Sequence, residues 1–90
     1  MATVRLAPVL RSSVGGVKQV SAGGETLADV LSDLYVKYPA LKEQIQPGDT
    51  LSRFINIYVN DQDVRHLQGL ETSISPADTV ILLPAMAGGR

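Results

Sequence analysis

The sequence of 90 residues has no cysteine and only one histidine, and each scarcity removes a class of function. Without cysteine the chain forms no disulfide and has no thiol with which to bind a metal. Zinc sites built from clusters of cysteine and histidine are therefore excluded. A serine–histidine triad has little support, because no G-x-S-x-G sequence is present. We expect His66 to be a solvated turn residue rather than a catalytic one.

Calcium is also excluded, although Asp61 and Asp63 resemble the start of a calcium-binding loop. A twelve-residue loop that begins at Asp61 needs glycine at its sixth position and glutamate at its last. These positions hold His66 and Thr72. We therefore expect no metal site and no bound cofactor in this chain.

The chain has no strong charge of either sign and no long apolar run. Its formal net charge is −1, and its eight basic residues are scattered, so a nucleic-acid partner is not expected. No run approaches the roughly 18 apolar residues of a membrane helix, and the first ten residues do not resemble a secretion signal. The sequence thus predicts a cytoplasmic protein without a membrane partner. Its 44% hydrophobic content is typical of one folded domain.

The first half of the sequence predicts a hairpin followed by a helix. Apolar and polar residues alternate over residues 3–6 and 17–21, and serines and glycines between them indicate a turn. Thr26 and Asp29 have capping-box spacing, which predicts a helix start. Pro39 ends that helix. Apolar residues recur along it every three or four positions: Leu27, Val30, Leu31, Leu34 and Tyr38. Leu41 and Ile45 indicate a short further helical turn.

The second half predicts strands. Residues 54–59 are rich in aromatic and β-branched side chains and are followed by Asn60-Asp61, a pair typical of tight turns. We expect a weak strand around residues 63–65 and a strong one over residues 79–83. The single substantial helix excludes a doubly wound sheet, so the pattern favours an α+β fold in which a sheet clasps one helix.

The strand over residues 79–83 is apolar on both faces. Val80 and Leu82 point to one face, whereas Ile81 and Leu83 point to the other, because side chains alternate along a strand. One helix covers one face of a small sheet, so Ile81 and Leu83 are candidates for docking a partner. Cover by a loop or by a second copy of the chain is the alternative.

The sequence ends with a segment of small residues, Ala-Met-Ala-Gly-Gly-Arg, at positions 85–90. We expect residues 1–84 to form the folded domain and residues 85–90 to be a flexible tail. Fully extended, the five steps from Pro84 to Gly89 span at most about 18 Å, enough to reach into the active site of another protein. Gly88 and Gly89 can pass a narrow channel because they have no side chains.

Two segments resemble the ThiS, MoaD and CysO family of sulfur-carrier proteins, and its CysO-like members most strongly. They are RFINIYVNDQDVR at residues 53–65 and LPAMAGG at residues 83–89. The resemblance covers nearly the whole chain. It implies a ubiquitin-like β-grasp fold, with a mixed sheet of four or five strands clasping one main helix. It also implies a protein cosubstrate rather than an enzyme.

The family resemblance implies acyl chemistry at Gly89. An adenylyltransferase of the ubiquitin-activating type, using ATP and magnesium, activates the glycine carboxylate, and a sulfurtransferase step converts it to a thiocarboxylate. Gly88 then provides access to the active site. Arg90 blocks the Gly89 carboxylate, so a peptidase, expected to be metal-dependent, must remove it first. Alternatively, Arg90 is not native to the protein.

The resemblance leaves the sulfur acceptor open. CysO-like carriers serve a pyridoxal-phosphate-dependent cysteine synthase, whereas other members serve thiazole, molybdopterin or specialised-metabolite synthesis. Two other functions fit the sequence. One is a modifier that is joined to lysines of target proteins through the same tail, and the other is a non-catalytic binding module that uses the sheet surface and does not need its tail.

The arginines form no continuous basic run, and most are expected to be solvated strand residues, Arg5 among them. Arg11 and Arg65 are the two candidates for docking an acidic partner.

Overall fold

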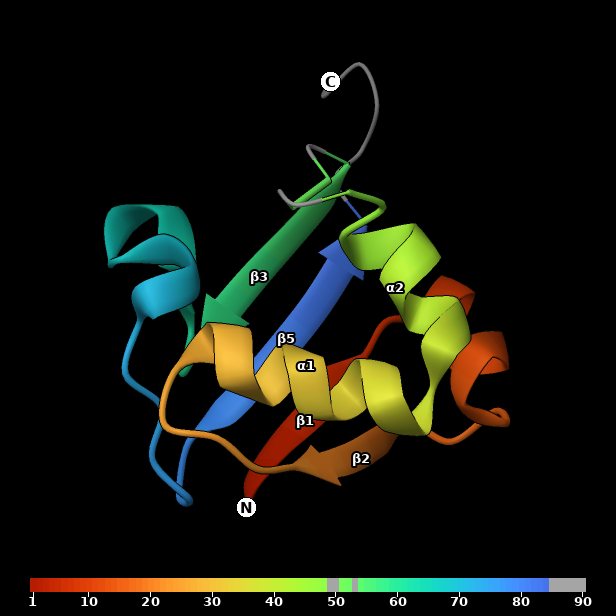
Figure 1. Ribbon diagram of the computed structural model, residues 1–90, viewed down its shortest axis with the longest axis horizontal. Helices are drawn as coiled ribbons and strands as arrows, with labels where there is room; N and C mark the ends of the chain where they lie inside the picture. The colour runs from red at the N-terminus through yellow and green to blue at the C-terminus, as the bar shows by residue number, and fades with distance from the viewer. Residues whose placement is uncertain (49–50, 53, 85–90) are drawn as a thin grey trace.

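A five-stranded mixed sheet and two α-helices make up the described part of the chain, residues 1–48, 51–52 and 54–84 of a computed structural model (Figure 1). The spatial order of the strands is β2-β1-β5-β3-β4. The central strands β1 and β5 are parallel, and every other neighbouring pair is antiparallel. The strands are β1 (Ala2–Leu6), β2 (Gln19–Ala22), β3 (Ile55–Val59), β4 (Gln62–Asp63) and β5 (Thr79–Pro84).

The predicted hairpin is present, but its connection is more than a turn. β1 and β2 pair antiparallel, with Val4 opposite Val20. Between them lies a 3₁₀ helix, η1 (Pro8–Val14), which buries Leu10 and Val14 and ends at Gly15 with φ 76°. The prediction of a simple turn was wrong because the two buried apolar residues, four positions apart, hold this connection against the core.

The helix α1 (Leu27–Lys37) begins and ends where the sequence predicts. The Thr26 hydroxyl accepts a hydrogen bond from the Asp29 amide at 3.3 Å, so it caps the helix as expected. The helix α2 (Pro39–Ile45) follows at once, because proline is favoured in the first turn of a helix although it ends the preceding one. Figure 1 shows α1 lying across the sheet, with α2 on the same side.

In the second half, β3 starts at Ile55, one residue later than predicted. Asn60 and Asp61 both have positive φ angles, 51° and 74°, and form the predicted turn into β4. The expected strand at residues 63–65 is shorter. β4 ends at Asp63, and two 3₁₀ helices follow, η2 (Val64–His66) and η3 (Gly69–Glu71), because Val64 turns inward and is buried.

The core lies between the helices and one face of the sheet. Four apolar residues of α1 are completely buried against that face: Leu27, Val30, Leu31 and Leu34. The two central strands contribute Val4 and Val80, which are register partners and also completely buried. Burial of one such side chain stabilises the fold by roughly 1.5–3 kcal/mol. Within the described residues, none of the helices has the length and apolar character needed to cross a membrane.

Candidate docking site

The alternation along β5 divides its side chains as the sequence predicts. Val80 and Leu82 are completely buried in the core, whereas Ile81 is half-buried and Leu83 is 38% exposed on the other face. β5 runs to Pro84, where the described residues end. The predicted tail, with Gly88, Gly89 and Arg90, lies outside the described residues.

The strands beside β5 surround Ile81 and Leu83 with polar side chains. Ile81 has Arg5 of β1 as its register partner on one side and Tyr58 of β3 on the other. Leu83 has Asn56 as its register partner on β3. We call this surface the open face of the sheet, because α1 and α2 cover the opposite one (Figure 1).

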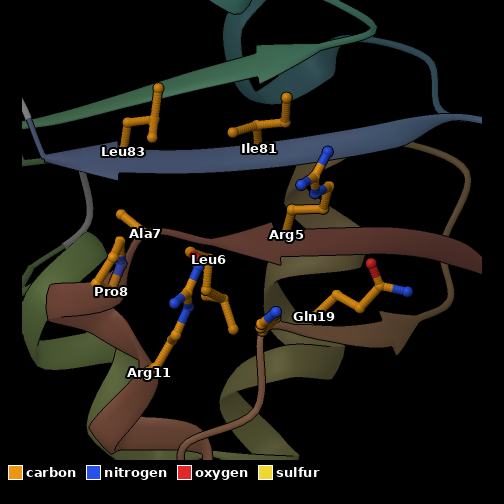
Figure 2. A pocket seen from close by; sticks show the side chains of 9 residues that line it. Arg5, Leu6, Ala7, Pro8, Arg11, Gln19, Ile81 and Leu83 are labelled. Atoms are coloured by element: carbon orange, nitrogen blue, oxygen red, sulfur yellow. The ribbon is translucent and has the colours of Figure 1, made fainter.

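A groove of about 360 Å³ lies at one end of the open face. Its apolar lining includes Ile81, Leu83, Ala7 and Pro8 (Figure 2). Ala7 follows β1 directly, and its amide donates a hydrogen bond to the Leu82 carbonyl at 3.1 Å. Because β1 and β5 are parallel, their carboxyl ends meet at the same edge of the sheet. The groove therefore adjoins the point from which residues 85–90 continue.

Three cationic residues also line this groove: Arg5, Arg11 and Lys18. Figure 2 shows Arg5 reaching from β1 toward Ile81, and Arg11 rising from η1 beside Leu6. The Arg11 Nε donates a hydrogen bond to the Leu6 carbonyl at 3.1 Å, which orients the side chain. Among the described residues, the lining contains no aspartate or glutamate. The groove therefore combines an apolar wall with positive charge.

The two arginines that the sequence singled out have different surroundings. Arg65 in η2 does not line the groove and is paired with Asp63, with an Nη2–Oδ2 distance of 2.8 Å. Its Nη2 also donates to the Asn56 Oδ1 at 2.6 Å. The Arg65 guanidinium holds the pKa of the Asp63 carboxyl below its ordinary value. Arg11 joins Ile81 and Leu83 at the groove, whereas the charge of Arg65 is already balanced.

Sequence reasoning missed Arg5 and Lys18 as groove residues. Arg5 was expected to be a solvated strand residue, and Lys18 follows glycines that indicated only a turn. The alternation of Val4, Arg5 and Leu6 does place Arg5 opposite the core. What the sequence did not predict is that β1 pairs with β5, which brings Arg5 beside Ile81.

The single histidine is exposed in η2, in agreement with the expectation of a solvated residue. It lines a second, polar groove together with Asn60, Gln62 and Asp78. Asp78 accepts hydrogen bonds from the Ser75 amide and the Asn60 side chain, both at 2.8 Å. These bonds give Asp78 a structural role in the turn before β5. Within the described residues, no three His, Asp or Glu side chains gather to hold a metal ion.

A mixed five-stranded sheet that clasps a helix, with an open face beside its central strand, defines a ubiquitin-like β-grasp protein. Both the predicted fold class and the predicted resemblance are thereby confirmed. The chain belongs to the ThiS family, whose model matches residues 4–89.

Relatives of known name agree with this assignment. The chain is 50% identical to the sulfur carrier protein CysO of Mycobacterium tuberculosis, with 97% of each chain covered. It matches a chain in the crystal structure of the Amycolatopsis orientalis BexX/CysO complex with a TM-score of 0.91 and 40% identity, covering 99% of this chain and 100% of that one. The small archaeal modifier protein 1 of Methanosarcina acetivorans matches with a TM-score of 0.84 and 39% identity, over 92% and 90% of the two chains.

Proposed function

We propose that this chain is a sulfur carrier whose cargo is held as a thiocarboxylate on Gly89. The observation that carries the proposal is the 50% identity to CysO over nearly the full length of both chains. The family match gives further support, because it includes Gly88 and Gly89 and stops before Arg90. The chain acts as a cosubstrate, and the catalytic groups belong to its partners.

The chemistry follows from the weakness of a carboxylate as an electrophile. An oxygen of the Gly89 carboxylate attacks the α-phosphate of ATP, and pyrophosphate leaves. Hydrosulfide then attacks the carbonyl carbon, the bond to the AMP oxygen breaks, and a thiocarboxylate remains. The activating enzyme holds ATP and magnesium, which neutralises phosphate charge. A carrier without cysteine has no thiol to intercept its own acyl-adenylate.

Within this cycle, the folded domain presents the tail and the open face docks the partner. Ile81 and Leu83 supply apolar contact, and Arg11 supplies charge at the groove. Arg65 contributes less, because Asp63 already balances its charge. Since β5 ends at Pro84, an enzyme that holds the open face also has the start of residues 85–90 within reach.

The partners follow from the same chemistry. An adenylyltransferase and sulfurtransferase load the carrier, and a C-terminal-processing metallopeptidase removes Arg90. A pyridoxal-phosphate-dependent cysteine synthase is the proposed acceptor, because the relative at 50% identity is a CysO. Because loading consumes ATP, we expect the carrier to act in the cytoplasm.

Loading in vitro tests the proposal. Two forms of the protein, one ending at Gly89 and one retaining Arg90, are incubated with a ThiF-type adenylyltransferase, ATP, magnesium and sulfide. Intact-mass measurement is expected to show one oxygen-to-sulfur exchange in the form ending at Gly89 and no change in the other. Loading of the form that retains Arg90 would overturn the need for processing. Failure of both forms to load, with a known ThiF-dependent carrier loading in parallel, would overturn the proposed cargo.

One alternative has an observation in its favour. The small archaeal modifier protein of Methanosarcina acetivorans shares 39% identity, so a modifier joined to lysines through Gly89 is the second candidate. Lysine-linked adducts in cells that express the chain ending at Gly89, and no thiocarboxylate, would favour the modifier. A binding module without tail chemistry predicts instead that deletion of residues 88–90 leaves function unchanged.

A further inference from the structure

The lysine and arginine side chains that the structure describes fall into two groups. Three lie away from the groove and have partners: Lys37 pairs with Asp33 at 3.1 Å, Lys42 donates to two backbone carbonyls, and Arg65 pairs with Asp63. In the groove, the side chains of Arg5 and Lys18 make no hydrogen bond or ion pair with any other described residue. Arg11 uses only its Nε, on a backbone carbonyl. The unpaired lysine and arginine side chains in the described part of the chain are thus concentrated at the groove.

The rest of the chain has the opposite charge. The formal net charge is −1, with eight basic and nine acidic residues. Because three basic residues and no acidic ones line the groove, the remainder has five basic and nine acidic residues. A groove of one sign on a protein of the other sign attracts a complementary partner locally.

We infer that this groove binds a short acidic segment of a partner protein, with an aliphatic side chain between its carboxylates. The guanidinium groups of Arg5 and Arg11 suit carboxylates, which they can bind through two parallel hydrogen bonds. Ile81 and Leu83 form the apolar wall that receives the aliphatic side chain. A protein segment can supply both kinds of contact at once, whereas inorganic phosphate can supply only charge. A long polyanion such as DNA would be repelled by the acidic remainder.

The position of the groove indicates that the segment belongs to an enzyme that acts on residues 85–90. Leu83 lines the groove, and the next residue, Pro84, is the last of β5. An enzyme that receives residues 85–90 therefore lies against the groove. Resting on the proposed function, the acidic segment belongs to the activating adenylyltransferase. It holds the carrier by charge before the tail reacts.

Peptide titration of the ¹⁵N-labelled protein tests the groove without any sulfur chemistry. One probe alternates glutamate with leucine, and the other alternates glutamine with leucine at the same length. The acidic peptide is expected to shift the amide signals of Arg5, Lys18 and Leu83, and to bind roughly tenfold more tightly than the neutral one. Salt at high concentration should remove that difference. Equal binding of the two peptides, or tighter binding of inorganic phosphate or duplex DNA at the same residues, would overturn the inference.

Charge variants test whether acidic-peptide binding depends on the cations of the groove. Arg5→Gln with Lys18→Gln removes two cationic side chains that make no hydrogen bond or ion pair with any other described residue, so the fold is retained. This double variant should bind the acidic peptide roughly tenfold more weakly. The matched control is Lys37→Gln with Lys42→Gln, which removes the same charge from the two α-helices and should leave binding within twofold. An equal loss of acidic-peptide binding in both double variants would show that the net charge of the protein, and not the groove, determines the affinity.

Kinetics of ATP–pyrophosphate exchange then separate this inference from the proposed function. In the form ending at Gly89, the groove double variant should raise the KM for the carrier about tenfold and leave kcat unchanged. An unchanged KM, with exchange still dependent on Gly89, would refute the role of the groove and leave the carrier function standing. Acidic-peptide binding without any exchange would refute the carrier function and leave the groove standing.

Discussion

The two faces of β5 show how one strand can pack a core on one side and leave apolar side chains uncovered on the other. Leu82 is completely buried under the helices, while its neighbour Leu83 is 38% exposed beside the cationic groove. Both are leucines on the same strand, and only the alternation of side chains distinguishes them. The comparison teaches that apolar character alone does not identify a core residue. An apolar residue on the open face costs little stability to replace and remains available to a partner.

Replacing each leucine by alanine makes this comparison directly. Leu82→Ala should lower the free energy of unfolding by about 3 kcal/mol, because it leaves a cavity in the core. Leu83→Ala should change it by about 0.5 kcal/mol or less, while raising the KM for the carrier in ATP–pyrophosphate exchange. Urea denaturation and the exchange assay measure the two effects. A comparable loss of stability in both variants would show that the open face is structural.

Packing of the helices on the sheet also depends on a close contact at the start of α1, where the backbone at Gly24 approaches Asp29 and Val30. A Cβ atom on Gly24 would lie 2.6 Å from the Cβ of Asp29 and 2.7 Å from the Val30 amide nitrogen. Gly24→Ala should therefore lower the free energy of unfolding by about 2 kcal/mol. Gly23→Ala is the matched control, because its Cβ would meet only the Met1 side chain at 3.7 Å. Thermal melts that are alike for the two variants would contradict the close approach.

The cap of α1 should contribute less than these core contacts. Thr26→Ala removes the hydroxyl that accepts from the Asp29 amide and should cost about 1 kcal/mol in urea denaturation. Thr26→Ser keeps an accepting oxygen and should retain most of that stability. If the serine variant loses as much free energy of unfolding as the alanine variant, packing of the threonine methyl group contributes more to stability than the cap does.

The smallest expected effect concerns the ion pair on the open face. The pKa of Asp63 is lowered, first by its hydrogen bond from the Arg65 side chain. The carboxylate therefore stabilises the fold above the ordinary pKa of aspartate, and this contribution is lost as pH falls through the lowered value. Arg65→Gln should reduce the fall in melting temperature between about pH 5 and about pH 2.

Part of the acid sensitivity should survive in the Arg65→Gln variant, because the pKa values of Asp33 and Asp78 are also lowered by their own hydrogen bonds. Parallel pH profiles for the native protein and the variant would contradict a contribution from Arg65. At neutral pH the two proteins should differ little, since solvent screens an ion pair whose guanidinium is exposed.

Local patterns predicted much of the fold. The three- and four-residue spacing of Leu27, Val30 and Leu34 predicted the buried face of α1, and the alternation from Val80 to Leu83 predicted both faces of β5. Two predictions failed where a polar pattern concealed a buried residue. Val14 lies next to the Ser-Ser and Gly-Gly pairs yet is buried in η1, and Val64 is buried in η2 between two charged residues.

The amino-acid sequence by itself determined most of the helices and strands, the two faces of β5, the lack of a thiol and the presence of the Gly88-Gly89 pair. Only the tertiary structure decided which cations share a surface. The parallel pairing of β1 with β5 places Arg5 beside Ile81. Of Arg11 and Arg65, the two arginines that the sequence proposed for docking, Arg11 lines the groove, whereas Arg65 pairs with Asp63. The reason is physical: side-chain periodicity is set by the local backbone, whereas strand order depends on contacts between residues more than seventy positions apart, such as Thr3 and Thr79.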